Sequence, residues 1–432
     1  MRPRTTPAGV EAAYNHGFTT LRHSCMGCEI MLAPVECARL LSAHMIGRPI
    51  LGAIGRKLRQ GRGIIALCTS LLYRDAADRA YLGRTLELSI ELPYLISLFP
   101  RDFALSSTVE GHPALEWKMR HAVVAVTMPT VPPAPGKGIA PGDLKVIEGL
   151  NDAGLTFSVQ SYPKAAGPQA PVDASEAALA AEDLGAWVLG QFATVAEVKA
   201  ALDKQAVLLA PVPILGNIPM PFHYSVHDTT GASLVIEFHE GVRTVYDNPV
   251  GVMTNAPQFS WHLTNLNNYA FLNNVDHSTG QFNGFDVAQP GSGIAKAGLP
   301  GTDTSVDRFI RAAYYAQFAE KQTDADKAVQ MVAHIMNNFD RPRGITIDPP
   351  NQGSGHLHVE GHEITTIPTE STSWTSLTDL DRRRLYIRDS GGMNYACFDL
   401  QALGSVTAFQ TKPMAKLAPA VTDASAALTA AA

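Results

Sequence analysis

Short runs of apolar, strand-forming residues alternate with polar turns through most of the chain. At the start of this pattern, two such runs at 68–73 and 80–86 flank the polar segment 74–79. Runs of this length around a polar turn predict a β-hairpin. In antiparallel register, cross-strand side chains lie about 5 Å apart. We therefore expect the thiol of Cys68 and the guanidinium of Arg84 to be neighbours.

The middle of the chain repeats this strand pattern, and two later stretches have a helical pattern. Residues 174–189 and 194–203 are rich in Ala, Leu and Glu, which favours helices. Thr304 and Asp307 have the spacing of a capping box, which predicts a helix to about residue 319, followed by another at about 324–339. Strands followed by helices and then strands indicate an α+β fold. The remaining predicted strands are 122–127, 155–159, 223–226, 233–238, 242–246, 374–377, 384–387 and 396–400.

Composition narrows the class of protein. The chain has 432 residues, 46% of them hydrophobic, and a formal net charge of −6 with no dense basic patch, which argues against a nucleic-acid partner. No apolar run reaches the roughly 18 residues of a membrane span. Five cysteines, three of them near the N-terminus, do not form a disulfide framework. We expect a cytoplasmic protein, with an Ala-rich, disordered tail at 413–432.

Residues 1–67 differ from the rest of the chain and end in the basic run 56–63. A nearby arginine lowers the pKa of a thiol from about 8.5 and so favours the reactive thiolate. A cysteine at the N-terminus of a chain can also use its own α-amine, with a pKa near 8, as the base. Cys68 could gain that position in two ways. Either the Leu67–Cys68 bond is cleaved, or translation starts at position 67 and the first residue is lost.

Several motifs lie in order between about residues 68 and 410: Cys68-Thr69-Ser70, Gly83-Arg84-Thr85, Asn248 to Pro257, Asn265 to Tyr269, Gly298 to Gly301, and Arg308 to Ala312. Together they resemble the choloylglycine hydrolase family, which includes bile salt hydrolases and penicillin V acylases. This family belongs to the N-terminal nucleophile hydrolases. The resemblance implies a four-layer αββα sandwich with two antiparallel sheets over residues 68–412, no cofactor, and commonly a homotetramer.

The resemblance also implies roles for individual residues. Cys68 would be the nucleophile beside Arg84, Asn255 would donate its side-chain amide to the oxyanion, and Arg308 would order the polar network. Two positions depart from the family pattern. Glu87 stands where relatives commonly have aspartate, so the carboxylate that would hold the α-ammonium has a longer arm. Ser161 stands where relatives often have Asn or Tyr, but its backbone N–H can still complete the oxyanion hole.

The implied substrates are small-molecule amides with a bulky apolar acyl side. Conjugated bile salts, penicillin V and N-acyl-homoserine lactones all fit this description, and the sequence does not rank them. Leu88, Tyr94 and Phe222 lie in segments expected to line the acyl pocket.

Three other interpretations stay open. His356, His358 and His362, with Glu360 between them, would share one face of a strand and suit a metal-dependent hydrolase. Cys25, Cys28 and Cys37 loosely suggest a zinc site. Alternatively, a retained N-terminal extension would block the α-amine and leave a catalytically inactive binding protein.

Overall fold

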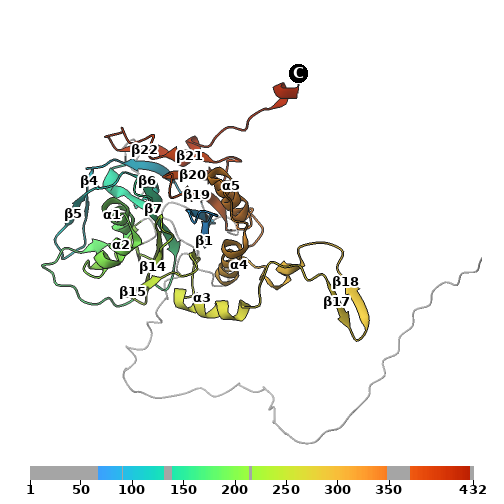
Figure 1. Cartoon of the computed structure of the whole chain (residues 1–432). Coiled ribbons are helices and arrows are strands. Elements are labelled where there is room, and N and C mark those ends of the chain that lie inside the picture. The colour runs from blue at the N-terminus through green and yellow to red at the C-terminus, as the bar shows by residue number, and fades with distance from the viewer. Residues whose placement is uncertain (1–66, 90, 131–138, 214–216, 348–369, 429–432) are drawn as a thin grey trace, which may run out of the picture. The chain divides into compact units, whose positions relative to one another are not determined.

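The computed structural model of the protein describes residues 67–89, 91–130, 139–213, 217–347 and 370–428. Within these ranges, two large antiparallel sheets pack against each other between helices (Figure 1). The β-hairpin expected at the start of this region is present: β1 pairs with β2 along its whole length.

The first sheet has six strands among the described residues, in the order β16-β1-β2-β19-β20-β21. The N-terminal hairpin therefore lies inside the sheet, with a strand on each side of it. The strands of the first sheet are β1 (Leu67–Arg74), β2 (Ala80–Leu88), β16 (Val252–Met253), β19 (Ser371–Asp379), β20 (Arg384–Asp389) and β21 (Ala396–Asp399).

The second sheet has eight strands in the described ranges, in the order β15-β14-β13-β8-β7-β6-β3-β22. The three strands predicted from residue 223 onward, β13 to β15, are antiparallel neighbours as expected. The strands are β3 (Leu95–Phe99), β6 (Val123–Pro129), β7 (Leu144–Asn151), β8 (Thr156–Ser161), β13 (Phe222–His227), β14 (Ser233–His239), β15 (Val242–Asp247) and β22 (Gln410–Pro413).

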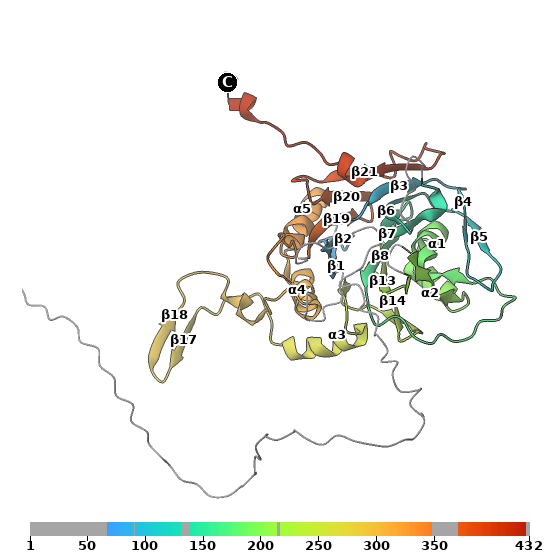
Figure 2. The ribbon, with the colours of Figure 1, turned by 180° about the vertical axis from the view of Figure 1, so that it is seen from behind.

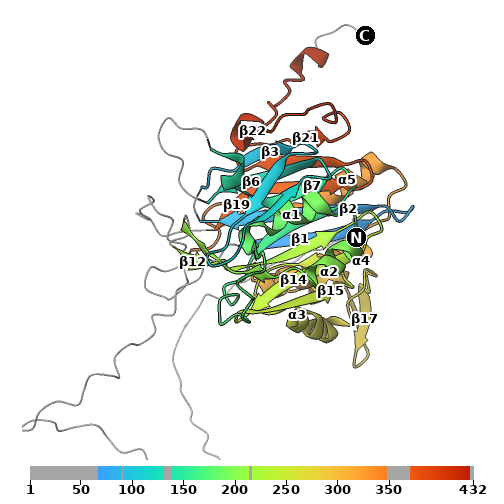
Figure 3. The same cartoon turned by 90° about the vertical axis from the view of Figure 1, so that its left-hand side faces the viewer.

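Helices cover the outer face of each sheet (Figure 1), and Figure 3 shows the helices of one face in front of the sheets. α4 (Ser305–Phe318) and α5 (Ala325–Met336) pack on β1, β2 and β19, and their apolar side chains form one core cluster with that sheet. α1 (Leu184–Gln191) and α2 (Val195–Leu202) pack on the second sheet. A larger cluster contains side chains from both sheets. The order helix, sheet, sheet, helix is the αββα sandwich that the family resemblance implies.

The helix predicted from residue 174 is wrong in its first half. Leu179–Ala180 forms β9, which pairs in parallel with β10 (Val207–Leu208), and the N–H of Ala180 donates to Ser107 Oγ. These tertiary contacts outweigh the helical propensity of an Ala-rich segment. The helix α1 therefore begins only at Leu184.

The capping box predicted for α4 forms only in part. Thr304 Oγ1 accepts from the N–H of Asp307, but the Asp307 carboxylate accepts from the N–H and hydroxyl of Thr302.

Near the C-terminus, Pro413 in β22 pairs with Leu95 in β3, and Met414 is buried in the larger core cluster. The packed structure thus reaches at least Met414.

The remaining elements are short. The hairpin β17–β18 extends away from the sheets in both Figure 1 and Figure 2. Within the described residues, no helix combines the length and the hydropathy needed to span a bilayer. These elements are β4 (Ala104–Ser107), β5 (Leu115–Lys118), β11 (Pro211–Val212), β12 (Ile218–Pro219), α3 (Phe259–Leu266), β17 (Thr279–Phe282), β18 (Phe285–Ala288) and the 3-10 helices Pro141–Asp143, Ala181–Asp183, Asn267–Tyr269, Ile294–Gly298, Met414–Lys416 and Ser425–Leu428.

Candidate active site

Cys68 lies at the start of β1, between the two sheets. In the hairpin register Cys68 pairs with Leu86 and Ser70 pairs with Arg84, so the thiol and the guanidinium lie on the same face of the sheet. Arg84 Nη2 is 3.7 Å from Cys68 Sγ. Cys68 is 1% exposed and Arg84 is fully buried. The hairpin thus brings these two side chains together as the sequence pattern predicts.

Arg84 makes further contacts that the sequence did not predict. Its Nη1 forms an ion pair of 3.1 Å with Glu148 Oε2 and donates to the carbonyl of Ile147, and its Nη2 donates to the carbonyl of Val159. The guanidinium also lies over the ring of Trp374, 4.6 Å from its centroid. The only sequence signal for Glu148 was an acidic residue between the apolar pair Val146-Ile147 and Leu150, since a buried carboxylate needs a partner.

The pKa of the Cys68 thiol is raised, which differs from the effect expected of a neighbouring arginine. Burial is the main cause; Arg84 lowers the pKa, Glu87 raises it, and the backbone N–H of Ser161 lowers it. Desolvation disfavours the thiolate. In this form of the chain, where Leu67 precedes Cys68, the neutral thiol is therefore favoured in spite of the arginine.

Asn255 lies just beyond β16 and contacts the backbone of Cys68. Asn255 Oδ1 accepts from the N–H of Cys68 at 2.9 Å, and Asn255 Nδ2 donates to the carbonyl of Ser161 at 3.0 Å. The N–H of Asn255 donates to Ser305 Oγ at 2.8 Å. The pairing of β16 with β1 explains this placement, because it brings the segment after Met253 to the start of β1. Asn255 thus lies beside the main chain of both Cys68 and Ser161.

Arg308 reaches the same backbone from α4 and is fully buried. Its Nη1 donates to the carbonyl of Cys68 and, at 2.7 Å, to Thr69 Oγ1. Its Nη2 donates to Asn255 Oδ1 at 2.7 Å. Arg308 therefore links the nucleophile candidate to the oxyanion candidate. Burial lowers the pKa of Arg308, while Glu87 raises it.

Glu87 lies opposite Leu67 in the hairpin and is fully buried. In the part of the chain that the structure describes, neither of its carboxylate oxygens makes a hydrogen bond of good geometry, although the Thr85 hydroxyl is near enough to act against the rise in its pKa. Burial raises the pKa of Glu87 to about 7, although the positive charge of Arg308 lowers it. An ionised carboxylate without a close partner is costly in such a place, so the site would gain from a cation near Leu67 and Cys68.

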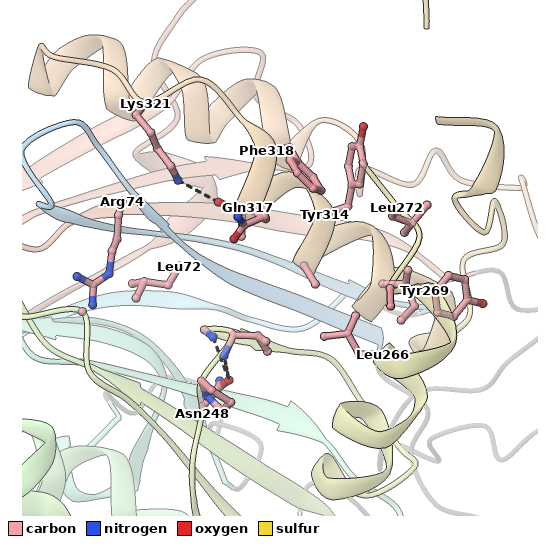
Figure 4. Close-up of a pocket in the computed structure, with 18 residues that line it drawn as sticks. Leu72, Arg74, Asn248, Leu266, Tyr269, Leu272, Tyr314, Gln317, Phe318 and Lys321 are labelled. Carbon is pink, nitrogen blue, oxygen red and sulfur yellow. Dashed lines mark hydrogen bonds between the residues drawn. The ribbon is translucent and has the colours of Figure 1, made fainter. Parts of the chain in front are cut away.

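The residues predicted to bind the acyl group pack into the same core cluster as Cys68. Leu88 and Tyr94 are buried in it, and the half-buried Phe222 packs against it. The ring of Tyr94 meets that of Trp374 edge to face, with centroids 5.8 Å apart. A separate cavity of about 460 Å³ lies between β1 and α4 (Figure 4). Its walls include neither the residues predicted to bind the acyl group nor Cys68, Arg84, Asn255 and Arg308.

The structure does not test the metal interpretation. His356, His358 and His362 lie outside the described residues, as do Cys25, Cys28 and Cys37. In the parts of the chain that are described, no group of three or more His, Cys, Asp and Glu side chains is arranged to hold a metal ion.

Comparison with known proteins agrees with this arrangement. The model of the family "Linear amide C-N hydrolases, choloylglycine hydrolase family" matches residues 68–401. The bile salt hydrolase/transferase of Lactiplantibacillus plantarum is 27% identical over 328 residues, which cover 74% of this chain and 89% of that protein. The penicillin V acylase of Pectobacterium atrosepticum is 26% identical, over 78% of this chain and 86% of that protein.

Solved structures show the same fold. The conjugated bile acid hydrolase of Clostridium perfringens superposes with a TM-score of 0.66 at 23% identity, over 82% of this chain and 99% of that one. The penicillin V acylase of Agrobacterium tumefaciens gives a TM-score of 0.59 at 23% identity, over 80% and 91%. The fold is thus that of an N-terminal nucleophile hydrolase. With a family match over more than half of its length, the chain belongs to the choloylglycine hydrolase family and is a hydrolase of linear amide C–N bonds.

Proposed function

We propose that the chain from Cys68 onward hydrolyses linear amides through a thioester acyl-enzyme, with Cys68 as nucleophile. The observation that carries this proposal is that Asn255 and Arg308 hold the N–H and the carbonyl of Cys68, while Arg84 contacts its sulfur. The family match begins at this same residue. Buried polar groups fix the cysteine backbone, as a nucleophile in a water-poor site requires.

The α-amine of a released Cys68 would act as the base. It would lie where the Cys68 N–H now donates to Asn255 Oδ1. Glu87, which pairs with the preceding residue Leu67, is near enough for its charge to act on the Cys68 thiol. The amine takes the thiol proton, the sulfur attacks the substrate carbonyl, and the C–N bond breaks as the proton passes to the leaving amine. Water then hydrolyses the thioester, again with the amine as base.

The oxyanion donors would be the side-chain amide of Asn255 and the backbone N–H of Ser161. The Asn255 side chain already bonds the main chain of Cys68 and Ser161, and the backbone N–H of Ser161 opposes the rise that burial causes in the pKa of the Cys68 thiol. One preorganised donor of this kind contributes about 2.7–4 kcal/mol to transition-state stabilisation. The apolar side chains around Cys68 suit a bulky acyl group such as a bile acid, a phenoxyacetyl group or a long acyl chain.

The test compares the full-length chain with a chain that has only an initiator methionine before Cys68. Each is offered glycine- or taurine-conjugated bile salt, penicillin V and an N-acyl-homoserine lactone, and mass spectrometry identifies the N-terminal residue. We expect activity only in protein with Cys68 at its N-terminus, and an adduct of one acyl group on that protein. Equal turnover by the Cys68→Ser variant, or by protein that keeps residues 1–67, would refute the proposal.

A further inference from the structure

A cluster of buried polar side chains lies behind the turn that carries Asn255. His223 on β13, Glu237 on β14 and His262 on α3 are each at most 1% exposed. Buried polar groups of this kind cost free energy unless they are hydrogen-bonded. Besides the contact between His223 and Glu237, the two histidines contact the backbone carbonyls of Thr254 and Asn255.

His223 lies between two hydrogen-bond acceptors. Its Nε2 is 3.0 Å from the carbonyl oxygen of Thr254, and its Nδ1 is 3.2 Å from Glu237 Oε2. The same carboxylate oxygen accepts from the N–H of Phe259, the first residue of α3. Because a carbonyl only accepts, Nε2 must carry a hydrogen. The contact at Nδ1 then needs a second proton, shared between the imidazole and the carboxylate of Glu237.

His262 holds the next carbonyl along the chain. Its Nε2 is 2.9 Å from the carbonyl oxygen of Asn255, so this nitrogen also carries a hydrogen. Burial lowers the pKa of His262 to about 4, which keeps the ring neutral at neutral pH. The ring stacks on Phe309 with centroids 4.6 Å apart, next to Arg308 in α4. Its orientation is therefore set by packing.

The same cluster reaches the second oxyanion candidate. Tyr162, which directly follows Ser161, stacks on His223 with ring centroids 4.8 Å apart. The Tyr162 hydroxyl is 2.7 Å from His239 Nδ1, and His239 Nε2 is 2.8 Å from Gln258 Nε2. The segments that carry Ser161 and Asn255 are thus connected by one set of contacts.

We propose that His223 and His262 are positioning residues, which hold the carbonyls of Thr254 and Asn255 and so aim the Asn255 side chain at the reacting carbonyl. Glu237 acts through His223 by keeping its Nδ1 side occupied. The proposal rests on the function proposed above for Asn255. Misplacement of a catalytic group by about 1 Å can cost on the order of 10²-fold in rate, so loss of either histidine contact should be visible in kcat.

The test uses pairs of variants in protein whose N-terminal residue is Cys68. His262→Leu removes the donor to Asn255, whereas His262→Gln offers an amide N–H in its place. His223→Leu removes the donor to Thr254, whereas Glu237→Gln lets an amide N–H donate to a neutral His223. The control is His227→Leu, because His227 is equally buried on β13 and its ring nitrogens have no hydrogen-bond partner among the described residues.

The measurements are kcat, KM, the rate of Cys68 alkylation by iodoacetamide, and the melting temperature. We expect both His→Leu variants at 223 and 262 to lose on the order of 10²-fold in kcat, with KM and alkylation rate close to wild type. His262→Gln and Glu237→Gln should keep most of the activity. A purely structural role would instead lower the alkylation rate and the melting temperature along with kcat.

Two outcomes would overturn the proposal. One is a loss in kcat no larger than that of His227→Leu; the other is equal impairment of the Leu and Gln variants at position 262. If a Leu variant does not fold, the variants His262→Gln and Glu237→Gln still test the proposal. It requires that both keep an activity near that of the wild type. A wild-type protein without Cys68-dependent turnover is a distinct result, which would remove the proposed function itself.

Discussion

The two sides of Cys68 differ in how completely their charges are paired. On the sulfur side, the guanidinium of Arg84 contacts the thiol, the carboxylate of Glu148 and two backbone carbonyls. On the main-chain side, Arg308 donates to the carbonyl of Cys68 and to Asn255 Oδ1. Both oxygens of Glu87, however, lack a hydrogen-bond partner in the described structure. Both carboxylates are fully buried, and burial raises the pKa of each to about 7.

This difference indicates which side already has an ion pair while Leu67 is still attached, although Arg84 Nε and Glu148 Oε1 have no hydrogen-bond partner among the described residues. The sulfur side already has its cation. On the main-chain side, Glu87 pairs across the hairpin with Leu67, the residue whose removal would create a new α-ammonium at Cys68. Under the proposed function, removal of the preceding residue would therefore supply both the catalytic base and the missing partner of Glu87.

The largest expected effect is on the sulfur side. Arg84→Leu should destabilise the protein by about 3–5 kcal/mol, because it leaves Glu148 as an unpaired buried carboxylate. Urea unfolding at neutral pH measures this change. The double variant Arg84→Leu/Glu148→Leu should recover most of the lost stability, since no charge then stays buried. A double variant as unstable as the single one would show that the pairing is not the cause.

The next effect is on catalysis from the main-chain side. Asn255→Ala should lower kcat by about 10²–10³-fold, which corresponds to the loss of one oxyanion donor. Steady-state kinetics on protein released at Cys68 measures it, and the alkylation rate of the thiol serves as the control. A variant with wild-type kcat would mean that Asn255 only holds the cysteine backbone.

Glu87 should make the stability of the unreleased chain depend on pH. The pKa of Glu87 is about 7 in the folded chain and 4.5 ordinarily. Below pH 4.5 the group is protonated in both states; as pH rises from 4.5 to 7, only the unfolded state ionises, so stability falls. The effect reaches at most about 3 kcal/mol. Glu87→Gln should remove the part of the decline that Glu87 causes, while Glu148, whose pKa burial also raises to about 7, keeps its own part. Urea unfolding of the variant and the wild type at pH 4.5 and 8 measures the difference. An unchanged pH dependence in the variant would contradict the raised pKa.

The smallest effect is expected at an exposed ion pair in the same hairpin. Arg74 and Asp78 lie 2.7 Å apart, with the Asp78 side chain 74% exposed. Asp78→Asn should change stability by less than about 0.5 kcal/mol, because solvent screens such pairs. Asparagine also tolerates the positive φ of this position. A loss of stability in Asp78→Asn as large as that in Arg84→Leu would show that burial is not the reason for the effect of Arg84 on stability.

Local patterns were enough to predict several parts of the site. The hairpin follows from two apolar runs around a polar turn, and it places Arg84 beside Cys68 through a short sequence separation. Glu148 and His223 were missed because their partners lie on other strands or on loops far along the chain. The helix predicted from residue 174 failed for the same reason, since β9 forms only through pairing with β10.

The sequence by itself determined the alternation of strands and helices, the hairpin and the family motifs, because these depend on residues close together in the chain. Only the tertiary structure decided that burial outweighs Arg84 at the thiol, that Glu87 lacks a partner and that Asn255 and Arg308 meet at the backbone of Cys68. Charge energetics depend on how deeply groups are buried and on what lies across the sheet. Those properties exist only once distant segments have packed together.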